Sequence, residues 1–237
     1  MTQVKDKPDT KIFGNPIQDI RMEDVLVACQ NAGYTAVFMP ELIEHRISAY
    51  SYSSLWDSWI ITPSVRVTGI TKSGTPVVVY AHVENYFSNP ANIKASRERG
   101  LRNGAGEVPQ EEFQRLVDLE DGQTVFVVDY ETLRKSSSHV ISVYEALGHP
   151  QTIPFLGGKD RAVRYLEKHR QIYGERIGIW HIDDLVRLPP RVAWGRVLSV
   201  TDHYLPNTPG GLSGCHNLDA GGYFLGKALT SSKEKDH

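Results

Sequence analysis

The chain has 237 residues and a net charge of −2 at pH 7, with 40% hydrophobic and 23% charged residues. This is the composition of an ordinary globular protein, and its charge balance does not indicate a nucleic-acid or membrane partner. No apolar run in the sequence approaches the length needed to cross a membrane. The two cysteines, Cys29 and Cys215, are too few to organise a fold of this size, which favours a reducing, cytoplasmic location. The first residues are polar and show no secretory signal.

The first half of the chain is expected to combine helices and strands. Apolar residues at helical spacing predict helices, and β-branched or aromatic runs predict strands. In chain order, the sequence predicts a helix at 21–33, a strand at 34–39, a helix from Pro40, a hairpin of strands at 59–71 and 76–87, and an irregular loop at 88–110.

The second half is expected to contain βαβ crossovers. In chain order, the sequence predicts a helix at 111–121, a strand at 124–129, a helix at 136–150, a short strand at 152–156, a helix at 157–175 and a strand at 177–181. Strands and helices that alternate at these lengths predict a parallel sheet. Two β runs at 191–201 and 223–229, separated by a glycine-rich loop at 205–222, complete the chain.

We therefore expect a mixed α/β fold in one domain of residues 1–237. A central parallel βαβ unit would be flanked by a β-rich N-terminal hairpin and a C-terminal β hairpin. A division into a β-rich part at 13–105 and a βαβ-containing part at 106–230 stays open.

Polar residues follow each strand of the expected parallel unit. They are Asp129 after the first strand, Gly157, Gly158, Lys159 and Arg161 after the second, and His181, Asp183 and Asp184 after the third. In open α/β sheets, ligands bind outside the carboxyl ends of the strands. The sequence therefore predicts one site at the edge where these three strands end.

Each group in this first site has a chemical use. Glycines at the start of a helix let backbone N–H groups approach an anion, and Lys159 and Arg161 add positive charge. Asp129, Asp183 and Asp184 could hold Mg²⁺. His181, with Asp183 and Asp129, could act as catalytic acid or base. The leading hypothesis is a phosphate-bearing ligand, bound by a metal-assisted hydrolase or transferase, although the spacing matches no known phosphate-binding signature.

A second candidate site is a nucleophile loop at 211–216. The Gly-Leu-Ser-Gly sequence around Ser213 resembles the nucleophile loop of chymotrypsin-like proteases, and Ala-His-Val around His82 resembles their histidine strand. A Ser213–His82–Asp129 set would be a catalytic triad, and Cys215, paired with His203 or His216, is a variant nucleophile. The helices expected within 136–175 argue against that all-β fold.

His82 and Glu84 share one face of an expected strand, which is an arrangement that some zinc enzymes use. The chain lacks the CxxC partner of those enzymes, so a hydrogen-bonded structural histidine is the simpler interpretation.

Two basic clusters suggest a weak nucleic-acid hypothesis, because arginine and lysine contact phosphates. They comprise Lys94, Arg97, Arg99 and Arg102 in the long loop, and Arg161, Arg164 and Lys168 on a later helix. The interleaved acidic residues favour a solvated surface instead.

The non-enzymatic alternative is a binding or assembly module. Tyr50, Tyr52, Trp56 and Trp59 lie within ten residues of each other, and exposed aromatic side chains of this kind are typical of partner surfaces. No sequence feature identifies the oligomeric state or the ligand.

Overall fold

A computed structural model describes residues 9–14, 20–136, 139–181, 192–201 and 210–229 of the chain. Its strands are β1 (Thr10–Phe13), β2 (Tyr34–Ala36), β3 (Ile60–Ile70), β4 (Pro76–Ala81), β5 (Gly106–Val108), β6 (Val125–Asp129), β7 (His139–Ser142), β8 (Arg176–Trp180), β9 (Ala193–Thr201), β10 (Gly211–His216) and β11 (Tyr223–Ala228). Its helices are α1 (Met22–Asn31), α2 (Met39–Ser48), the 3₁₀ turn η1 (Tyr86–Ser88), α3 (Pro90–Arg99), α4 (Gln110–Asp118), α5 (Tyr130–Lys135), α6 (Val143–Ala146), α7 (Thr152–Leu156) and α8 (Lys159–Tyr173).

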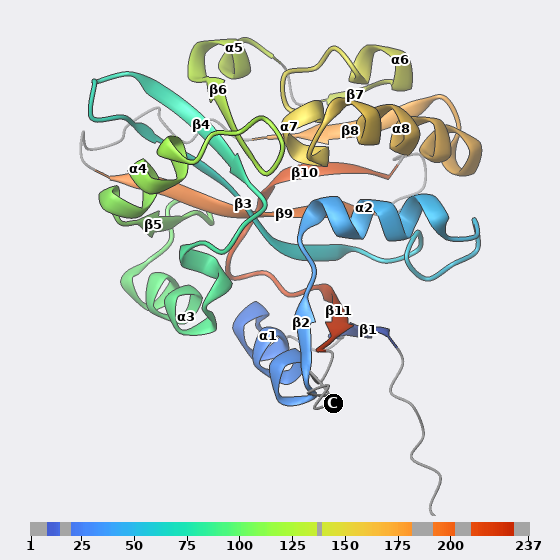
Figure 1. Cartoon of the computed structure of the whole chain (residues 1–237), viewed down its shortest axis with the longest axis horizontal. Coiled ribbons are helices and arrows are strands. Elements are labelled where there is room, and N and C mark those ends of the chain that lie inside the picture. The colour runs from blue at the N-terminus through green and yellow to red at the C-terminus, as the bar shows by residue number, and fades with distance from the viewer. Residues whose placement is uncertain (1–8, 15–19, 137–138, 182–191, 202–209, 230–237) are drawn as a thin grey trace, which may run out of the picture.

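The described strands form one mixed sheet (Figure 1). Its main path runs β1, β11, β3, β9, β10, β8, β7, while β2 joins β11, β4 joins β3 and β6, and β5 joins β9. Only the β8–β10 and β3–β11 pairs are parallel among the described strand pairs. The other described pairs are antiparallel, so the sheet is mostly antiparallel.

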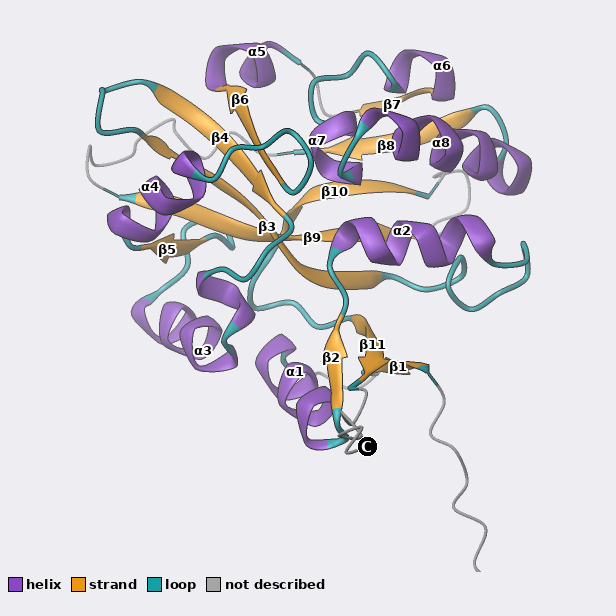
Figure 2. Cartoon of the chain, in the orientation of Figure 1, coloured by secondary structure: helices purple, strands orange, loops and turns teal. Residues whose placement is uncertain are grey.

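Side chains of successive strand residues point to opposite faces, and this gives the sheet two hydrophobic cores. Ile60 faces the core that α2, α7 and α8 cover, whereas Ile61 faces the core that α1, α3 and α4 cover. On β9, Leu198 and Val200 join the first core and Val197 joins the second. Figure 2 shows how the helices cover the strands. The central strands are therefore buried on both faces, like the strands of a parallel sheet.

The expected central parallel βαβ unit is wrong. β6 pairs antiparallel with β4, whereas β8 lies between β10 and β7, so the two strands are not neighbours. The apolar run at 124–129 is typical of any doubly covered strand, and burial alone does not fix strand direction.

The expected short strand at 152–156 is the helix α7. Thr152, Phe155 and Leu156 are buried at helical spacing, and Gly157 ends the helix in the left-handed conformation with φ of 73°. Pro154 is tolerated because it lies in the first turn, where its missing N–H has no helical partner.

Three further elements differ from the expectation. The loop at 88–110 contains α3, which begins at Pro90 directly after the N-cap Asn89, and it also contains β5. The helix expected at 136–150 is instead β7 followed by α6, whose start is a capping box of Ser142 and Glu145. β11 pairs with β1, β2 and β3 rather than with β9, so there is no C-terminal hairpin of 191–201 with 223–229.

The predicted hairpin forms from β3 and β4, with Val65 opposite Ala81 and Ile70 opposite Pro76, but its second strand ends at Ala81 rather than at residue 87. The longest described helix, α8, has 15 residues. None of the described helices is long and apolar enough to cross a membrane.

Gly195 on β9 tests the packing of the second core. A Cβ there would lie 2.6 Å from Phe87 Cε2 and 2.8 Å from Val108 Cγ2, closer than real Cβ contacts. We expect Gly195→Ala to lower the free energy of unfolding by about 1–3 kcal/mol through overpacking, as measured by urea denaturation. The control is Gly148→Ala, where the nearest contact is 3.5 Å away. Equal stability of the two variants would contradict this packing.

Candidate functional site

A cleft of about 520 Å³ lies between α2, α8 and the turn before β6. We call it the α2–α8 cleft. It is lined by Phe38, Pro40, Glu41, His82, Gly122, Gln123, Thr124, Gly157, Gly158, Lys159, Asp160, Arg161 and Arg164. Its sides are therefore the first turns of the two helices.

Ion pairs hold the two helices beside each other. Glu44 of α2 accepts from Arg161 Nε at 3.0 Å and from Arg164 Nη2 at 2.5 Å. The hydrogen bond from Arg164, together with Arg161, lowers the pKa of the Glu44 carboxyl despite its partial burial. Both arginines are thus engaged within the protein.

His82 forms the floor of the cleft and is part of a buried chain of hydrogen bonds. Its Nε2 lies 2.8 Å from the carbonyl oxygen of Pro154, which can only accept, so Nε2 carries the proton. Its Nδ1 lies 3.0 Å from Ser64 Oγ, which itself accepts from the Met39 N–H at 2.8 Å. These hydrogen bonds connect α2, β3, the residue after β4 and α7, and they fix the shape of the floor of the cleft.

Burial lowers the pKa of His82 to about 4, so the ring is neutral at pH 7. Both of its ring nitrogens are hydrogen-bonded. Glu84 is exposed, so the His82–Glu84 pair does not come together as a metal site. His82 is a structural histidine in this fold.

The glycines predicted to bind a ligand form one wall of the cleft. Gly157 and Gly158 have φ of 73° and 130°, which side chains rarely adopt. A Cβ on Gly157 would also lie 2.5 Å from Pro40 Cγ. Lys159 is exposed at the rim, and Arg161 Nη1 donates to the carbonyls of Leu156 and Gly157.

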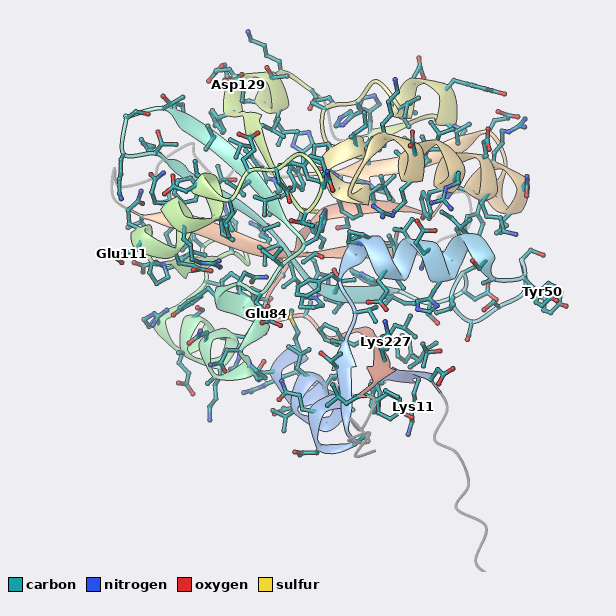
Figure 3. All side chains as sticks on the ribbon, in the orientation of Figure 1. Lys11, Tyr50, Glu84, Glu111, Asp129 and Lys227 are labelled. Carbon is teal, nitrogen blue, oxygen red and sulfur yellow. The ribbon has the colours of Figure 1, made fainter. Side chains whose placement is uncertain are left out.

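The other members of the first predicted site lie elsewhere. Asp129 ends β6, whereas the cleft lies at the beginning of β6, next to Thr124. Asp129 is exposed and caps α5 by accepting from Thr132 N at 2.7 Å, and the hydrogen bonds from Thr132 lower the pKa of its carboxyl. Figure 3 shows Asp129 at the periphery of the molecule.

His181 follows β8, within 3.2 Å of Ser136 Oγ and with its ring centroid 5.8 Å from that of His149. Asp183 and Asp184 lie outside the described residues. Within the described ranges, no three His, Cys, Asp or Glu side chains are grouped to hold a metal ion.

The second predicted site is not assembled as a triad. Ser213 Oγ lies 3.4 Å from Cys215 Sγ, both on β10, while both ring nitrogens of His82 are bonded to other groups. Asp129 is exposed and caps the N-terminus of α5. His203 lies outside the described residues, and His216 is buried against the edge of Trp59.

Most residues of the basic clusters are engaged within the protein. Arg97 pairs with Glu23 at 2.8 Å, Arg99 donates to Tyr86 Oη at 3.2 Å, and Arg102 lies over the ring of Trp194. Lys168 is partly buried and Lys94 is exposed.

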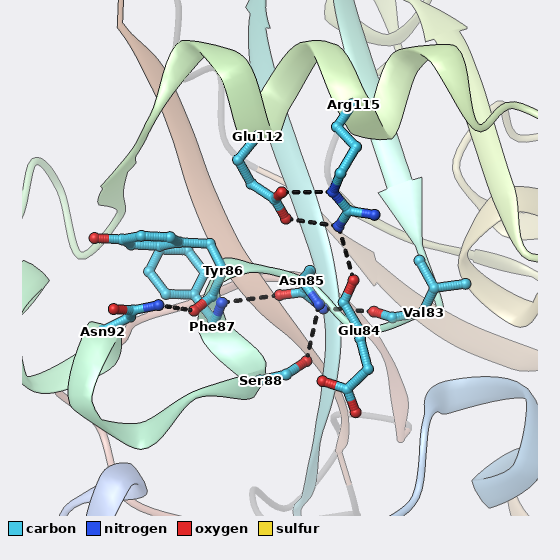
Figure 4. A network of polar contacts seen from close by, with 9 residues as sticks. All are labelled: Val83, Glu84, Asn85, Tyr86, Phe87, Ser88, Asn92, Glu112 and Arg115. Carbon is cyan, nitrogen blue, oxygen red and sulfur yellow. Dashed lines mark hydrogen bonds and ion pairs between the residues drawn. The ribbon is translucent and has the colours of Figure 1, made fainter.

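Another hollow, of about 390 Å³, lies beside η1 and α4. Figure 4 shows the network of polar contacts among the residues in this region. Arg115 pairs with Glu112 and donates to the carbonyl of Glu84 at 2.8 Å, and Asn92 donates to the carbonyl of Tyr86 at 2.9 Å. These bonds connect α4 to the segment between β4 and η1, and α3 to η1.

Of the aromatic residues predicted to form a partner surface, one is buried and the others are exposed to different degrees. Trp56 is fully buried, so its expected place on a partner surface is wrong. Tyr50 and Tyr52 are 74% and 80% exposed, and their rings stack in parallel with centroids 5.6 Å apart. Trp59 is partly exposed. Figure 3 shows Tyr50 projecting at the edge of the molecule.

Trp56 is held by groups from α2 and α8. Its Nε1 donates to the carbonyl of Arg46 at 2.9 Å, and the Arg46 guanidinium lies 5.2 Å from its ring centroid. Tyr165 stacks on the indole with centroids 5.5 Å apart, and Tyr173 Oη donates to the Trp56 carbonyl. Sequence patterns did not identify Arg46, because nothing in its neighbourhood distinguishes it from a surface helix residue.

Comparison with solved structures gives one strong similarity. It is a structure described as "Accommodation of massive sequence variation in Nanoarchaeota by the C-type lectin fold", with 49% sequence identity and a TM-score of 0.78. The alignment covers 91% of this chain and 95% of that chain. No protein-family model matches the chain, and no curated protein matches it.

This similarity, together with the lack of a metal cluster among the described residues, overturns the hypothesis of a phosphate-binding, metal-assisted hydrolase or transferase. That hypothesis depended on the expected parallel sheet, because only parallel strands would bring Asp129, Gly158 and Asp183 to the same edge.

The buried histidines predict how stability depends on pH. Burial lowers the pKa of His82 and of His216 to about 4, below the ordinary 6.5. Between these values the unfolded chain binds protons that the folded chain does not, so stability falls as the pH falls. We expect a loss of about 2 kcal/mol for each histidine by about pH 5, measured by urea denaturation.

The matched variant is His216→Gln, which should reduce this loss by about half. An unfolding free energy that stays constant between about pH 7 and about pH 5 would contradict the assignment.

Proposed function

Because the chain belongs to the family of proteins with the C-type lectin fold, we propose that it is a non-enzymatic binding module that holds an extended segment of a partner polypeptide in the α2–α8 cleft. The observation that carries the proposal is the similarity to a protein described as accommodating massive sequence variation. A scaffold that tolerates variation suits recognition, because catalysis needs fixed groups in fixed geometry.

The size and rigidity of the cleft support ligand binding. Its volume of about 520 Å³ is within the range of about 300–1,000 Å³ that ligand pockets occupy. Its floor is fixed by the hydrogen bonds of His82 and its sides by the pairs of Glu44. A preformed site loses little conformational entropy on binding.

The charges on the lining favour a polypeptide over a single anion. Lys159, Arg161 and Arg164 are offset by Glu41 and Asp160 on the same lining, and both arginines already pair with Glu44. A peptide chain, which carries donors, acceptors and side chains of either charge, matches such a mixed surface better than an anion does.

The uncharged part of the lining supports the same ligand class. Phe38 and Pro40 offer an apolar wall for a side chain of the partner, while the glycines at 122, 157 and 158 place no side chain in the cleft. Gly157, Gly158, Lys159 and Arg161, which the sequence singled out, are proposed to contact the ligand here. A nucleic-acid partner has less support, because Arg97, Arg99, Arg161 and Arg164 each have a partner within the chain.

Blocking the cleft tests the proposal. Thr124 is exposed on the cleft wall, so Thr124→Trp should fill the cleft without disturbing the core. A displayed library of random peptides should yield sequences that bind the native chain. Their affinity for Thr124→Trp, measured by calorimetry, should fall by at least about tenfold through lost contacts and exclusion.

The control is Thr75→Trp, at the exposed turn between β3 and β4, which should bind the selected peptides like the native chain. The proposal is wrong if no peptide is enriched, or if the enriched peptides bind Thr124→Trp as tightly as the native chain.

A further inference from the structure

We infer that residues 49–59 form a second recognition element, which docks a protein partner through an exposed arginine of that partner. We call these residues the tyrosine loop. The inference is independent of the cleft, because the loop follows the C-terminal end of α2, whereas the cleft lies at the N-terminal end.

Buried side chains and two backbone turns hold the tyrosine loop in one conformation. Trp56 and Arg46 are both fully buried, and Arg46 Nη2 donates to the carbonyl of Ser58 at 2.9 Å. Two turns fix the backbone between them, with Ser53 N donating to the Tyr50 carbonyl at 3.0 Å and Trp56 N to the Ser53 carbonyl at 2.8 Å. The tip is therefore ordered before any partner arrives.

The exposed tip has the composition of a binding surface. Tyr50 and Tyr52 stand in solvent with their rings nearly parallel, at an angle of 6°. Ser51 and Ser54 are also exposed and offer hydroxyl groups. Tyrosine and serine together are typical of protein-recognition loops, because tyrosine supplies large contact area at low entropic cost and serine adapts its hydrogen bonds.

The charge of the loop points to a cation on the partner. Residues 49–59 contain no lysine or arginine, and their single charged side chain, Asp57, is exposed. The loop also contacts the C-terminal ends of α2 and α8, through Ala49 and the bond from Tyr173 to Trp56, and these ends carry partial negative charge. The positive charge of Arg46 is buried beneath the indole and bonded to the main chain.

Arginine suits this surface better than lysine does. Its planar guanidinium can stack on a tyrosine face and at the same time donate to a carboxylate such as that of Asp57. An apolar partner would use the rings without needing the carboxylate, so the two alternatives differ in their dependence on charge.

Titration with a short peptide tests the inference on the full chain. The probe is acetyl-Gly-Arg-Gly-Arg-Gly-amide, and its reference is the same peptide with citrulline, which has the shape of arginine without the charge. We expect saturable NMR shifts of the Tyr50 and Tyr52 ring protons, with at least about two- to fivefold weaker binding of the citrulline peptide. Asp57→Asn should weaken arginine binding by a similar factor.

Matched variants separate recognition from stability. Tyr52→Ala should lose the shifts and Tyr52→Phe should keep them, while Tyr144→Ala, at a tyrosine that is 70% exposed on α6, should bind like the native chain. Thr124→Trp should also bind normally, so failure of the cleft proposal leaves this result unaffected. Equal binding of both peptides, no shift with either, or an equal loss in Tyr144→Ala would overturn the inference.

Discussion

The burial of Trp56 and Arg46 between α2 and α8 is the interaction on which both proposed surfaces depend. The Arg46 guanidinium and the Tyr165 ring both lie against the indole, so Trp56 ties the loop after α2 to the body of α8. Removing a buried tryptophan costs about 3–5 kcal/mol, which is a large share of the stability of a domain. The same two helices are also joined by the ion pairs of Glu44 with Arg161 and Arg164. The cleft and the tyrosine loop therefore belong to one rigid frame.

The sequence predicts local structure well where hydrophobic periodicity is strong, as in α1, α8 and the β3–β4 hairpin. It does not predict strand order. The central strands carry apolar residues on both faces because helices cover both sides of a mostly antiparallel sheet, and this pattern is the same as that of a parallel strand. Two local sequence signals do mark helix starts that hydrophobic periodicity does not show: Asn89-Pro90 marks the start of α3, and Ser142 with Glu145 marks the start of α6.

The site was only partly predictable for the same reason. Gly157, Gly158, Lys159 and Arg161 do line one cleft, because they are consecutive at the start of one helix. Their expected partners do not join them, since a partner from another element needs the correct topology. The tyrosines show a similar limit: composition indicated an aromatic surface at 50–59, but only the packing of α2 on α8 decides that Trp56 is inside and Tyr52 outside.

If this frame holds the recognition residues in place before binding, the tyrosine loop is rigid in the free chain, and backbone ¹⁵N relaxation measures that rigidity. We expect the amides of Tyr50 to Ser54 in the free chain to have order parameters near about 0.85, the value of rigid backbone. In Trp56→Ala the same amides should become mobile while those of β3 stay rigid. Order parameters below about 0.6 in the native chain, or no change in the variant, would contradict the claim.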